Sequence, residues 1–226
     1  MMNGHTRYEA VVFDLDGTLL DTLDDLTDAT NAALAKVGLK SRTRDEVKGF
    51  IGNGIAKLIE RAVGEENKTC RAEALTEFKR YYALHCADKT APYEGILDLL
   101  KNLQSQGVKT AVVSNKADFA VKSLAKEYFD GLLLAAVGEN EEAGIRKKPA
   151  PDSLLTVIEQ LSAEKGTTVY VGDSDVDIQT AENAGIDCIC VTWGFREKPF
   201  LIEKGGRIFV DTPAEIFDYI KGACTR

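Results

Sequence analysis

Two carboxylates stand directly after the first apolar run of the chain. Residues 10–13 read Ala-Val-Val-Phe, and Asp14 and Asp16 follow before Gly17 and Thr18. Carboxylates at the end of a buried strand can act as acids, bases or metal ligands, and a glycine beside them lets the backbone turn. An Asp-Gly pair is also an ordinary turn, which accounts for Asp16 but not for Asp14. We therefore expect Asp14 to have a chemical role.

A second polar pair follows a second apolar run. Residues 111–113 are Ala-Val-Val, and Ser114 and Asn115 come next. A hydroxyl and the backbone N–H groups that open a helix suit one oxygen of a phosphate. Ser-Asn is equally an ordinary helix start, so a phosphate-binding role for this pair is supported only in combination with the other motifs.

Acidic side chains also follow an apolar run at residues 169–171. After Gly172 come Asp173, Asp175 and Asp177, at the predicted start of a helix. Acidic residues stabilise a helix N-terminus through its dipole, which is a sufficient role for Asp175. Asp173, directly at the end of the predicted strand, is the stronger candidate for a metal ligand.

A lysine pair, Lys147 and Lys148, precedes Pro149. Such a pair usually belongs to a solvated basic loop ahead of a helix. A fixed ammonium group at a phosphate site would, however, neutralise both an attacking carboxylate and the entering phosphate. One of the two lysines is therefore a candidate site residue.

The Asp-Leu-Asp-Gly-Thr of residues 14–18 resembles the first motif of the haloacid dehalogenase superfamily, whose members are mostly phosphatases that form an aspartyl-phosphate. Ser114-Asn115, the lysine before Pro149 and the run from Asp173 resemble its other three motifs, in the same order. In the family the lysine stands directly before the proline, which selects Lys148 over Lys147.

This resemblance implies a role for each motif residue. The implied catalytic residues are Asp14 as nucleophile, Asp16 as general acid and base, and Lys148. The implied phosphate-binding residues are Thr18, Ser114 and Asn115. The implied metal ligands are Asp14, Asp16 through its backbone carbonyl, Asp173 and, in support, Asp177.

A cluster of Asp14, Asp173 and Asp177 would repel an entering phosphate. Two like charges about 4 Å apart cost roughly 4 kcal/mol at an effective dielectric constant of about 20. A divalent cation is therefore required in addition to a lysine, and an all-oxygen ligand set suits Mg²⁺. His5 and His85 are the only histidines, which nearly excludes a histidine-based zinc site.

Short apolar runs separated by helical patterns predict the architecture that positions these residues. The predicted strands are residues 10–13, 108–113, 132–137, 169–171 and 188–192, and predicted helices between them are residues 96–104, 151–161 and 175–183. Because the runs are apolar throughout, the strands should be buried on both faces. We expect an α/β protein with a doubly wound, Rossmann-like parallel sheet, and site residues at the carboxyl ends of its strands.

Residues 23–87 interrupt this alternation with helical stretches at residues 23–37, 55–63 and 70–84. They predict an all-helical cap domain inserted after the first strand. The predicted division is a core of residues 1–20 and 92–226 and a cap of residues 21–91. An inserted cap can close over a site and exclude water.

The cap loop resembles the phosphoglycolate phosphatase group of the superfamily. Residues 50–55 read Phe-Ile-Gly-Asn-Gly-Ile, with Lys57 and Arg61 on the helix that follows. The implied substrate-contacting residues are Gly52, Asn53 and Gly54. These glycines are also typical of a plain turn between helices, and a carboxylate-binding role for Lys57 or Arg61 stays open.

The composition of the chain argues against nucleic-acid and membrane partners. The chain has 226 residues, 44% of them hydrophobic, and a formal net charge of −8, whereas nucleic-acid binding normally needs a basic face. No apolar run approaches the length of a membrane span, and the first eight residues lack a signal-peptide core. We expect a cytoplasmic monomer or homodimer that binds a small phosphorylated metabolite, with no nucleic-acid partner and no membrane.

The leading prediction is a Mg²⁺-dependent phosphatase of small phosphate monoesters, similar to phosphoglycolate phosphatase. An inorganic pyrophosphatase and a sugar phosphomutase of the same superfamily would share every core motif, although no cap histidine stands at the loop to position a sugar hydroxyl. A receiver-like phosphoacceptor domain also pairs acidic residues with a lysine on a parallel sheet. The helical insertion and residues 14–18 argue against that alternative.

Overall fold

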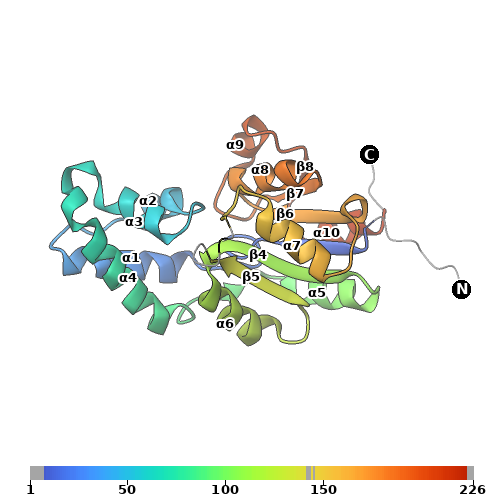
Figure 1. The fold of residues 1–226 in the computed structure, drawn as a ribbon, viewed down its shortest axis with the longest axis horizontal. Coiled ribbons are helices and arrows are strands. Elements are labelled where there is room, and N and C mark those ends of the chain that lie inside the picture. The colour runs from blue at the N-terminus through green and yellow to red at the C-terminus, as the bar shows by residue number, and fades with distance from the viewer. Residues whose placement is uncertain (1–7, 141–143, 145, 223–226) are drawn as a thin grey trace, which may run out of the picture.

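The structure is a computed structural model and describes residues 8–140, 144 and 146–222. A six-stranded sheet forms its larger part, with the strands in the order β5-β4-β1-β6-β7-β8 (Figure 1). The strands are β1 (Ala10–Phe13), β4 (Lys109–Ala117), β5 (Ala135–Glu139), β6 (Thr168–Gly172), β7 (Asp187–Val191) and β8 (Ile208–Val210). All neighbouring strands run parallel, which confirms the predicted fold class.

The side chains of β1 alternate between two hydrophobic layers. Val11 and Phe13 pack on one face, together with residues of α5 (Ile96–Ser105), α6 (Asp118–Phe129) and α10 (Pro213–Ile220). Ala10 and Val12 pack on the other face, together with residues of α7 (Asp152–Gln160) and α8 (Asp175–Ala184). Each buried side chain of this kind stabilises the fold by about 1.5–3 kcal/mol. A charged residue is therefore tolerated only where β1 ends, which is at Asp14.

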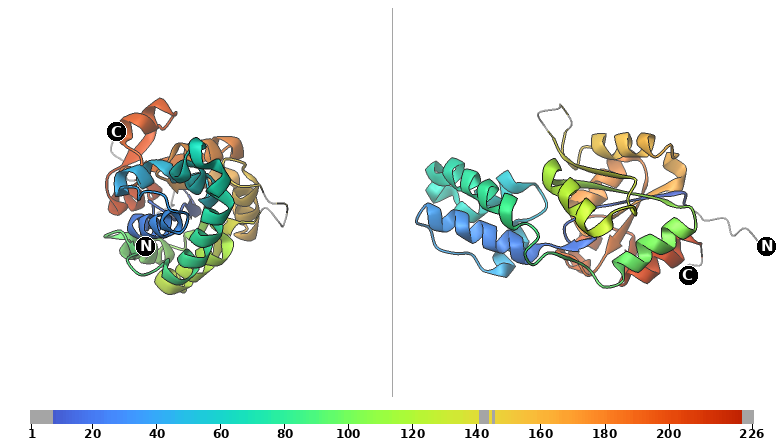
Figure 2. Two further views of the ribbon diagram at one scale, coloured as in Figure 1. Left: turned by 90° about the vertical axis from the view of Figure 1, so that its left-hand side faces the viewer. Right: turned by 90° about the horizontal axis from the view of Figure 1, so that it is seen from below.

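A separate group of helices lies beyond the carboxyl ends of the strands (Figure 2). It consists of α1 (Leu23–Lys36), α2 (Arg44–Phe50), α3 (Ile55–Val63), η1 (Glu65–Cys70) and α4 (Arg71–His85). Its apolar faces bury one another in their own hydrophobic cluster, whose members include Leu34, Val47, Ile59 and Phe78. We call this group the helical cap. Phe195, from the loop after β7, also packs into its cluster.

Two short strands connect the helical cap to the sheet. β2 (Leu20–Asp21) and β3 (Ala91–Pro92) pair antiparallel, so the chain leaves and returns at one place. Asp25 in the first turn of α1 reinforces this junction. Its carboxylate, 2% exposed, accepts hydrogen bonds from the backbone N–H groups of Lys89 and Thr90 and from the Thr90 hydroxyl.

Several elements differ from those predicted. β8 and α2 have no predicted counterpart, and β5 begins at Ala135, not at residue 132. The strand predicted for residues 108–113 is longer in the structure: β4 continues to Ala117, and α6 begins at Asp118. The register of β4 on β5 shifts between Val113 and Ala117, so the polar pair lies in an irregular part of the strand.

Two remaining helices, η3 (Lys165–Thr167) and α9 (Lys198–Glu203), precede β6 and β8 in the chain.

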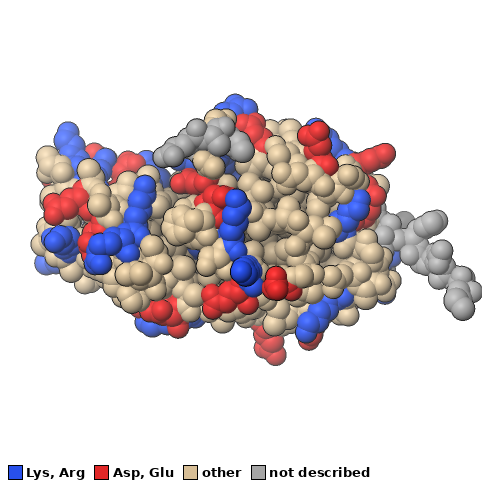
Figure 3. All heavy atoms as spheres, turned by 60° about the horizontal axis from the view of Figure 1, so that its bottom comes forward, with Lys and Arg blue, Asp and Glu red and all other residues tan. Residues whose placement is uncertain are grey.

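Among the described helices, none combines the length and apolar character that crossing a membrane requires. On the face shown in Figure 3, basic and acidic side chains are intermixed.

Candidate active site

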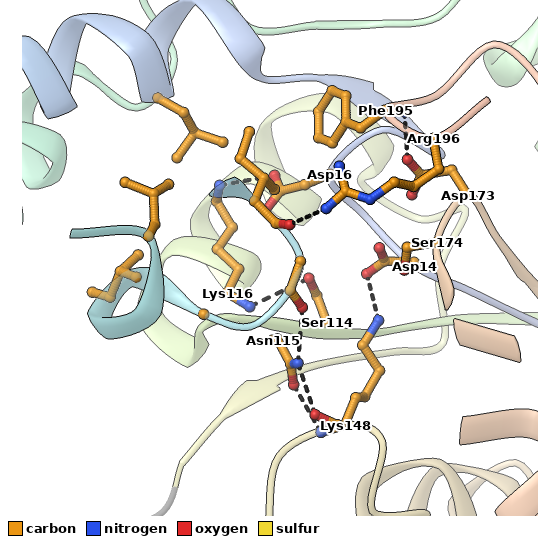
Figure 4. A pocket seen from close by; sticks show the side chains of 16 residues that line it. Asp14, Asp16, Ser114, Asn115, Lys116, Lys148, Asp173, Ser174, Phe195 and Arg196 are labelled. Carbon is orange, nitrogen blue, oxygen red and sulfur yellow. Dashed lines mark hydrogen bonds and ion pairs between the residues drawn. The ribbon is translucent and has the colours of Figure 1, made fainter. Parts of the chain in front are cut away.

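Four polar side chains from distant parts of the chain meet at the carboxyl ends of β1 and β6. Asp14 follows β1, Asp173 follows β6, and Lys148 precedes α7 (Figure 4). Asp177 lies in the first turn of α8. One carboxylate oxygen from each aspartate lies within 4.8 Å of the others. The structure thus brings together residues that the sequence analysis placed in one site.

Lys148 lies at the centre of this cluster, and its side chain is 3% exposed. Its Nζ is 2.9 Å from Asp14 Oδ1 and 2.7 Å from Asp177 Oδ1, and it donates to the Tyr170 hydroxyl at 2.9 Å. Burial lowers the pKa of Lys148, but the attraction of Asp14 and Asp177 outweighs burial and keeps this pKa well above its ordinary value. The ammonium group is therefore charged and fixed.

Asp177 positions that lysine. Its Oδ1 accepts from Lys148, and its Oδ2 accepts from the backbone N–H of Ser174 at 3.0 Å and from the Ser174 hydroxyl at 2.6 Å. A side chain at Gly172 would place its Cβ 2.3 Å from Asp177 Cγ, so the last residue of β6 must be glycine. Both carboxylate oxygens of Asp177 thus have protein donors, and its role as a metal ligand stays a prediction.

Asp14 and Asp173 are buried carboxylates with few compensating donors. Burial raises the pKa of Asp14 to about 7 despite the attraction of Lys148, and burial, Asp177 and Asp14 raise the pKa of Asp173 well above its ordinary value. Asp14 Oδ1 accepts no well-aligned hydrogen bond, although it faces Lys148. Buried carboxylates in this condition favour a bound cation, and an all-oxygen donor set fits Mg²⁺.

Asp173 is held from two sides. Its Oδ2 accepts from the backbone N–H of Phe195 at 2.6 Å, and its Oδ1 lies 3.4 Å from the Thr18 hydroxyl, which donates to it. Thr18 is fully buried and does not line the cavity. Its position therefore supports Asp173 and does not favour the direct phosphate contact that was predicted for it.

Both residues of the predicted phosphate-binding pair, Ser114 and Asn115, line the cavity. The Asn115 carboxamide also accepts from the Lys148 backbone N–H at 2.8 Å and donates to the Lys148 carbonyl at 3.0 Å. It also donates to the carbonyl of Gly52 at 3.2 Å. Asn115 thus holds the backbone of Lys148 in place and contacts the helical cap.

Lys116 is a site residue that the sequence analysis missed. It lies in β4 directly after Ser114-Asn115, its side chain is 2% exposed, and its Nζ is 2.9 Å from Asp16 Oδ1. It also donates to the hydroxyl of Tyr82, a residue of α4 in the helical cap. Burial lowers the pKa of Lys116, but Asp16 and Tyr82 together raise it above its ordinary value. A lysine that follows a buried strand and two candidate residues was the signal that could have found it.

The cap loop contributes backbone and apolar surface. Gly52 and Gly54 line the cavity, together with the apolar side chains of Leu26, Ile51, Ile55 and Leu58. The side-chain oxygen of Asn53 accepts from Arg61 at 2.8 Å, and Lys57 pairs with Glu60 at 2.9 Å on the exposed side of α3. Asn53, Lys57 and Arg61 do not line the cavity, so this geometry does not favour substrate contact through them.

Arg196 joins the sheet to the cap loop and was also missed. It lies in the loop after β7, lines the cavity and donates to the carbonyls of Lys48 at 2.9 Å and Ile51 at 2.6 Å. These carbonyls belong to the C-terminal end of α2, where backbone acceptors lack helical partners. The cavity between sheet and cap has a volume of about 50 Å³, a space that holds only a few water molecules.

A family model, curated relatives and a solved structure all indicate the same protein family for this chain. Residues 11–191 match the family model described as haloacid dehalogenase-like hydrolase. The chain is 34% identical to a phosphoglycolate phosphatase of Aquifex aeolicus, covering 82% of this chain and 85% of that protein, and 32% identical to one of Chromobacterium violaceum, covering 94% and 96%. A crystal structure from Lactobacillus delbrueckii subsp. bulgaricus, provisionally named a phosphoglycolate phosphatase, superposes with a TM-score of 0.88 at 41% identity, covering 95% of this chain and 98% of that one.

Proposed function

The chain belongs to the haloacid dehalogenase-like hydrolase family, and we propose that it is a Mg²⁺-dependent phosphatase that hydrolyses small phosphate monoesters through an aspartyl-phosphate on Asp14. The observation that carries this proposal is the position of Asp14. It emerges at the end of β1 with Lys148 2.9 Å from its Oδ1 and Asp173 within 4.8 Å. A nucleophile beside a fixed ammonium and a second carboxylate suits attack on a phosphate.

In the proposed reaction, an Asp14 oxygen attacks phosphorus and the bond from phosphorus to the leaving oxygen breaks. Asp16 gives its proton to the leaving oxygen and then accepts one from the water that hydrolyses the acyl phosphate. Ser114 and Lys148 contact the transferred oxygens. The charge of Lys148 compensates the negative charge that builds up on them.

The predicted magnesium site consists of the Asp14 carboxylate, the Asp16 backbone carbonyl and Asp173. Bound there, the ion would neutralise the phosphate and the two carboxylates that it approaches. The burial of Asp14 and Asp173 beside each other, with Asp14 Oδ1 lacking a well-aligned hydrogen bond, supports this assignment. Asp177 would act mainly through Lys148, with which it pairs at 2.7 Å.

Phosphoglycolate is the substrate that we propose first. The relatives from Aquifex aeolicus and Chromobacterium violaceum are named for this substrate. We further propose that residues 21–91 act as the cap that closes over the substrate. Their own hydrophobic cluster and the contacts of Arg196 with the cap loop support this role.

A substrate panel tests the proposal. The purified protein is incubated with 2-phosphoglycolate, pyrophosphate and hexose phosphates, each with Mg²⁺ and with EDTA, and released phosphate is measured. We expect Mg²⁺-dependent release from 2-phosphoglycolate, and loss of turnover in Asp14→Asn with the fold retained. Preference for pyrophosphate would overturn the proposed substrate, and full activity of Asp14→Asn would overturn the nucleophile.

A further inference from the structure

One hydrogen-bonded chain crosses from the sheet to the helical cap through the proposed acid and base. Lys116 Nζ lies 2.9 Å from Asp16 Oδ1 and donates also to the hydroxyl of Tyr82. Lys116 and Tyr82 are 4% and 4% exposed as whole residues. The three groups therefore interact with little competition from water.

The helical cap fixes the position of the Tyr82 hydroxyl. The Tyr82 ring stacks on Phe78 at a centroid distance of 5.3 Å and an interplanar angle of 23°. Phe78 is fully buried in the cap's hydrophobic cluster. Lys116 also lies over the Tyr82 ring, 4.7 Å from its centroid, which adds a cation–π attraction. The place of this hydroxyl thus depends on where the cap packs.

Lys116 has a different task from Lys148. Lys148 contacts the nucleophile Asp14, whereas Lys116 contacts Asp16. Lys116 holds Oδ1 of Asp16, and among the described residues none donates to Oδ2 of that carboxylate. A carboxyl group fixed through one oxygen can present the other to a leaving group in a single orientation.

We propose that Tyr82 is a positioning residue for the acid step: through Lys116 it orients Asp16, so that the acid is aligned only when the helical cap is seated on the sheet. This inference rests on the proposed phosphatase function. As the bond from phosphorus to the leaving oxygen breaks, its electron pair stays on that oxygen, which takes the proton from Oδ2 of Asp16. The carboxylate that forms is then stabilised by Lys116, and this stabilisation grows as the reaction proceeds.

A comparison of two substrates in Tyr82→Phe tests the proposal. This variant keeps the ring and removes only the hydroxyl. One substrate is 2-phosphoglycolate, whose alkoxide leaving group needs a proton. The other is p-nitrophenyl phosphate, whose phenolate leaves without one. The value of kcat/KM reports the steps up to formation of the aspartyl-phosphate, so slow hydrolysis of that intermediate does not mask the effect.

We expect Tyr82→Phe to lower kcat/KM about tenfold for 2-phosphoglycolate, a part of the 10²–10⁴-fold that general acid catalysis supplies. For p-nitrophenyl phosphate, the kcat/KM of the same variant should stay within about threefold of the wild-type value. Tyr81→Phe is the matched control, because Tyr81 is the neighbouring half-buried tyrosine, and its ring contacts that of His85 at a centroid distance of 4.3 Å. For this control variant, kcat/KM should equal that of wild type with both substrates.

Two results would overturn the role of Tyr82. One is an unchanged kcat/KM for both substrates, and the other is an equal loss for both, which a general loosening of the structure would cause. A wild-type protein that hydrolyses neither ester would instead count against the proposed phosphatase function. The two failures are therefore distinguishable.

Discussion

Lys148 and Asp177 form an ion pair of 2.7 Å between side chains that are 3% and 0% exposed. The pair connects the segment before α7 to the first turn of α8, and it turns the ammonium group toward Asp14. Breaking such a pair by removing one partner is costly, because the other charge stays buried. The arrangement therefore links the stability of the protein to the surroundings of Asp14, the proposed nucleophile.

The first prediction concerns this pair. Asp177→Ala should lower the free energy of unfolding by about 3 kcal/mol, since Lys148 and the Ser174 hydroxyl both lose a buried partner. Urea unfolding followed by circular dichroism measures this loss. Asp175→Ala, two residues earlier in α8, is the control and should cost much less. Equal stability of the two variants would contradict the structural role of Asp177.

The second prediction concerns pH and metal. The pKa of Asp14 rises from 3.8 to about 7 on folding, chiefly through burial. Between these values the folded state keeps a proton that the unfolded state has lost. The stability of the metal-free protein should therefore fall as pH rises through this window, by up to about 1.4 kcal/mol per pH unit, and level off above pH 7.

Asp14→Asn removes this titration. In EDTA, the variant should be more stable than wild type at pH 8, with a smaller difference at pH 5. Added Mg²⁺ should raise the melting temperature of wild type and have little effect on the variant. Thermal melts at the two pH values measure both effects. A variant less stable than wild type at pH 8 would refute the conclusion that the burial of Asp14 costs more than its attraction to Lys148 returns.

The third prediction concerns Arg196 and the cap loop. Arg196→Lys keeps the charge but cannot bond the carbonyls of Lys48 and Ile51 in the same forked geometry. A lost hydrogen bond from a charged donor is worth about 1.5 kcal/mol or more, so kcat/KM should fall roughly tenfold. Backbone amides of residues 48–54 should exchange hydrogen faster. Arg207→Lys, a change at an exposed arginine, is the control and should alter neither kcat/KM nor the exchange of these amides.

The fourth prediction concerns the junction between sheet and cap. Asp25→Ala leaves the N–H groups of Lys89 and Thr90 without their acceptor and should destabilise the protein by about 3 kcal/mol. Asp28→Ala removes only an exposed ion pair with Lys89 and serves as the control. Denaturant unfolding distinguishes them. A cost for Asp28→Ala as large as that for Asp25→Ala would contradict the prediction.

The sequence predicted strands where burial on both faces leaves a continuous apolar run. β1 has the predicted bounds, and β6 and β7 lie within one residue of theirs. β8 was missed, because it has three residues and is stabilised by pairing with β7, where Val191 opposes Val210.

Within the site, too, some residues could be placed from the sequence and others could not. Asp14 and Asp173 were placed together because parallel strands end on one edge of the sheet, and the structure has them there. Tyr82 could not be placed, because it lies 34 residues from Lys116 and on a different structural unit. Its approach depends on how the helices pack against the sheet, which periodicity along a helix does not determine.

The pairing of β2 with β3 also has an evolutionary consequence. Because the chain departs and re-enters at adjacent backbone positions, the distance between those two points does not depend on how many residues lie between them. An insertion of another length or fold can therefore be exchanged here without pulling on β1 or β4. Selectivity toward the leaving group can then diversify while the phosphate-handling chemistry is inherited unchanged.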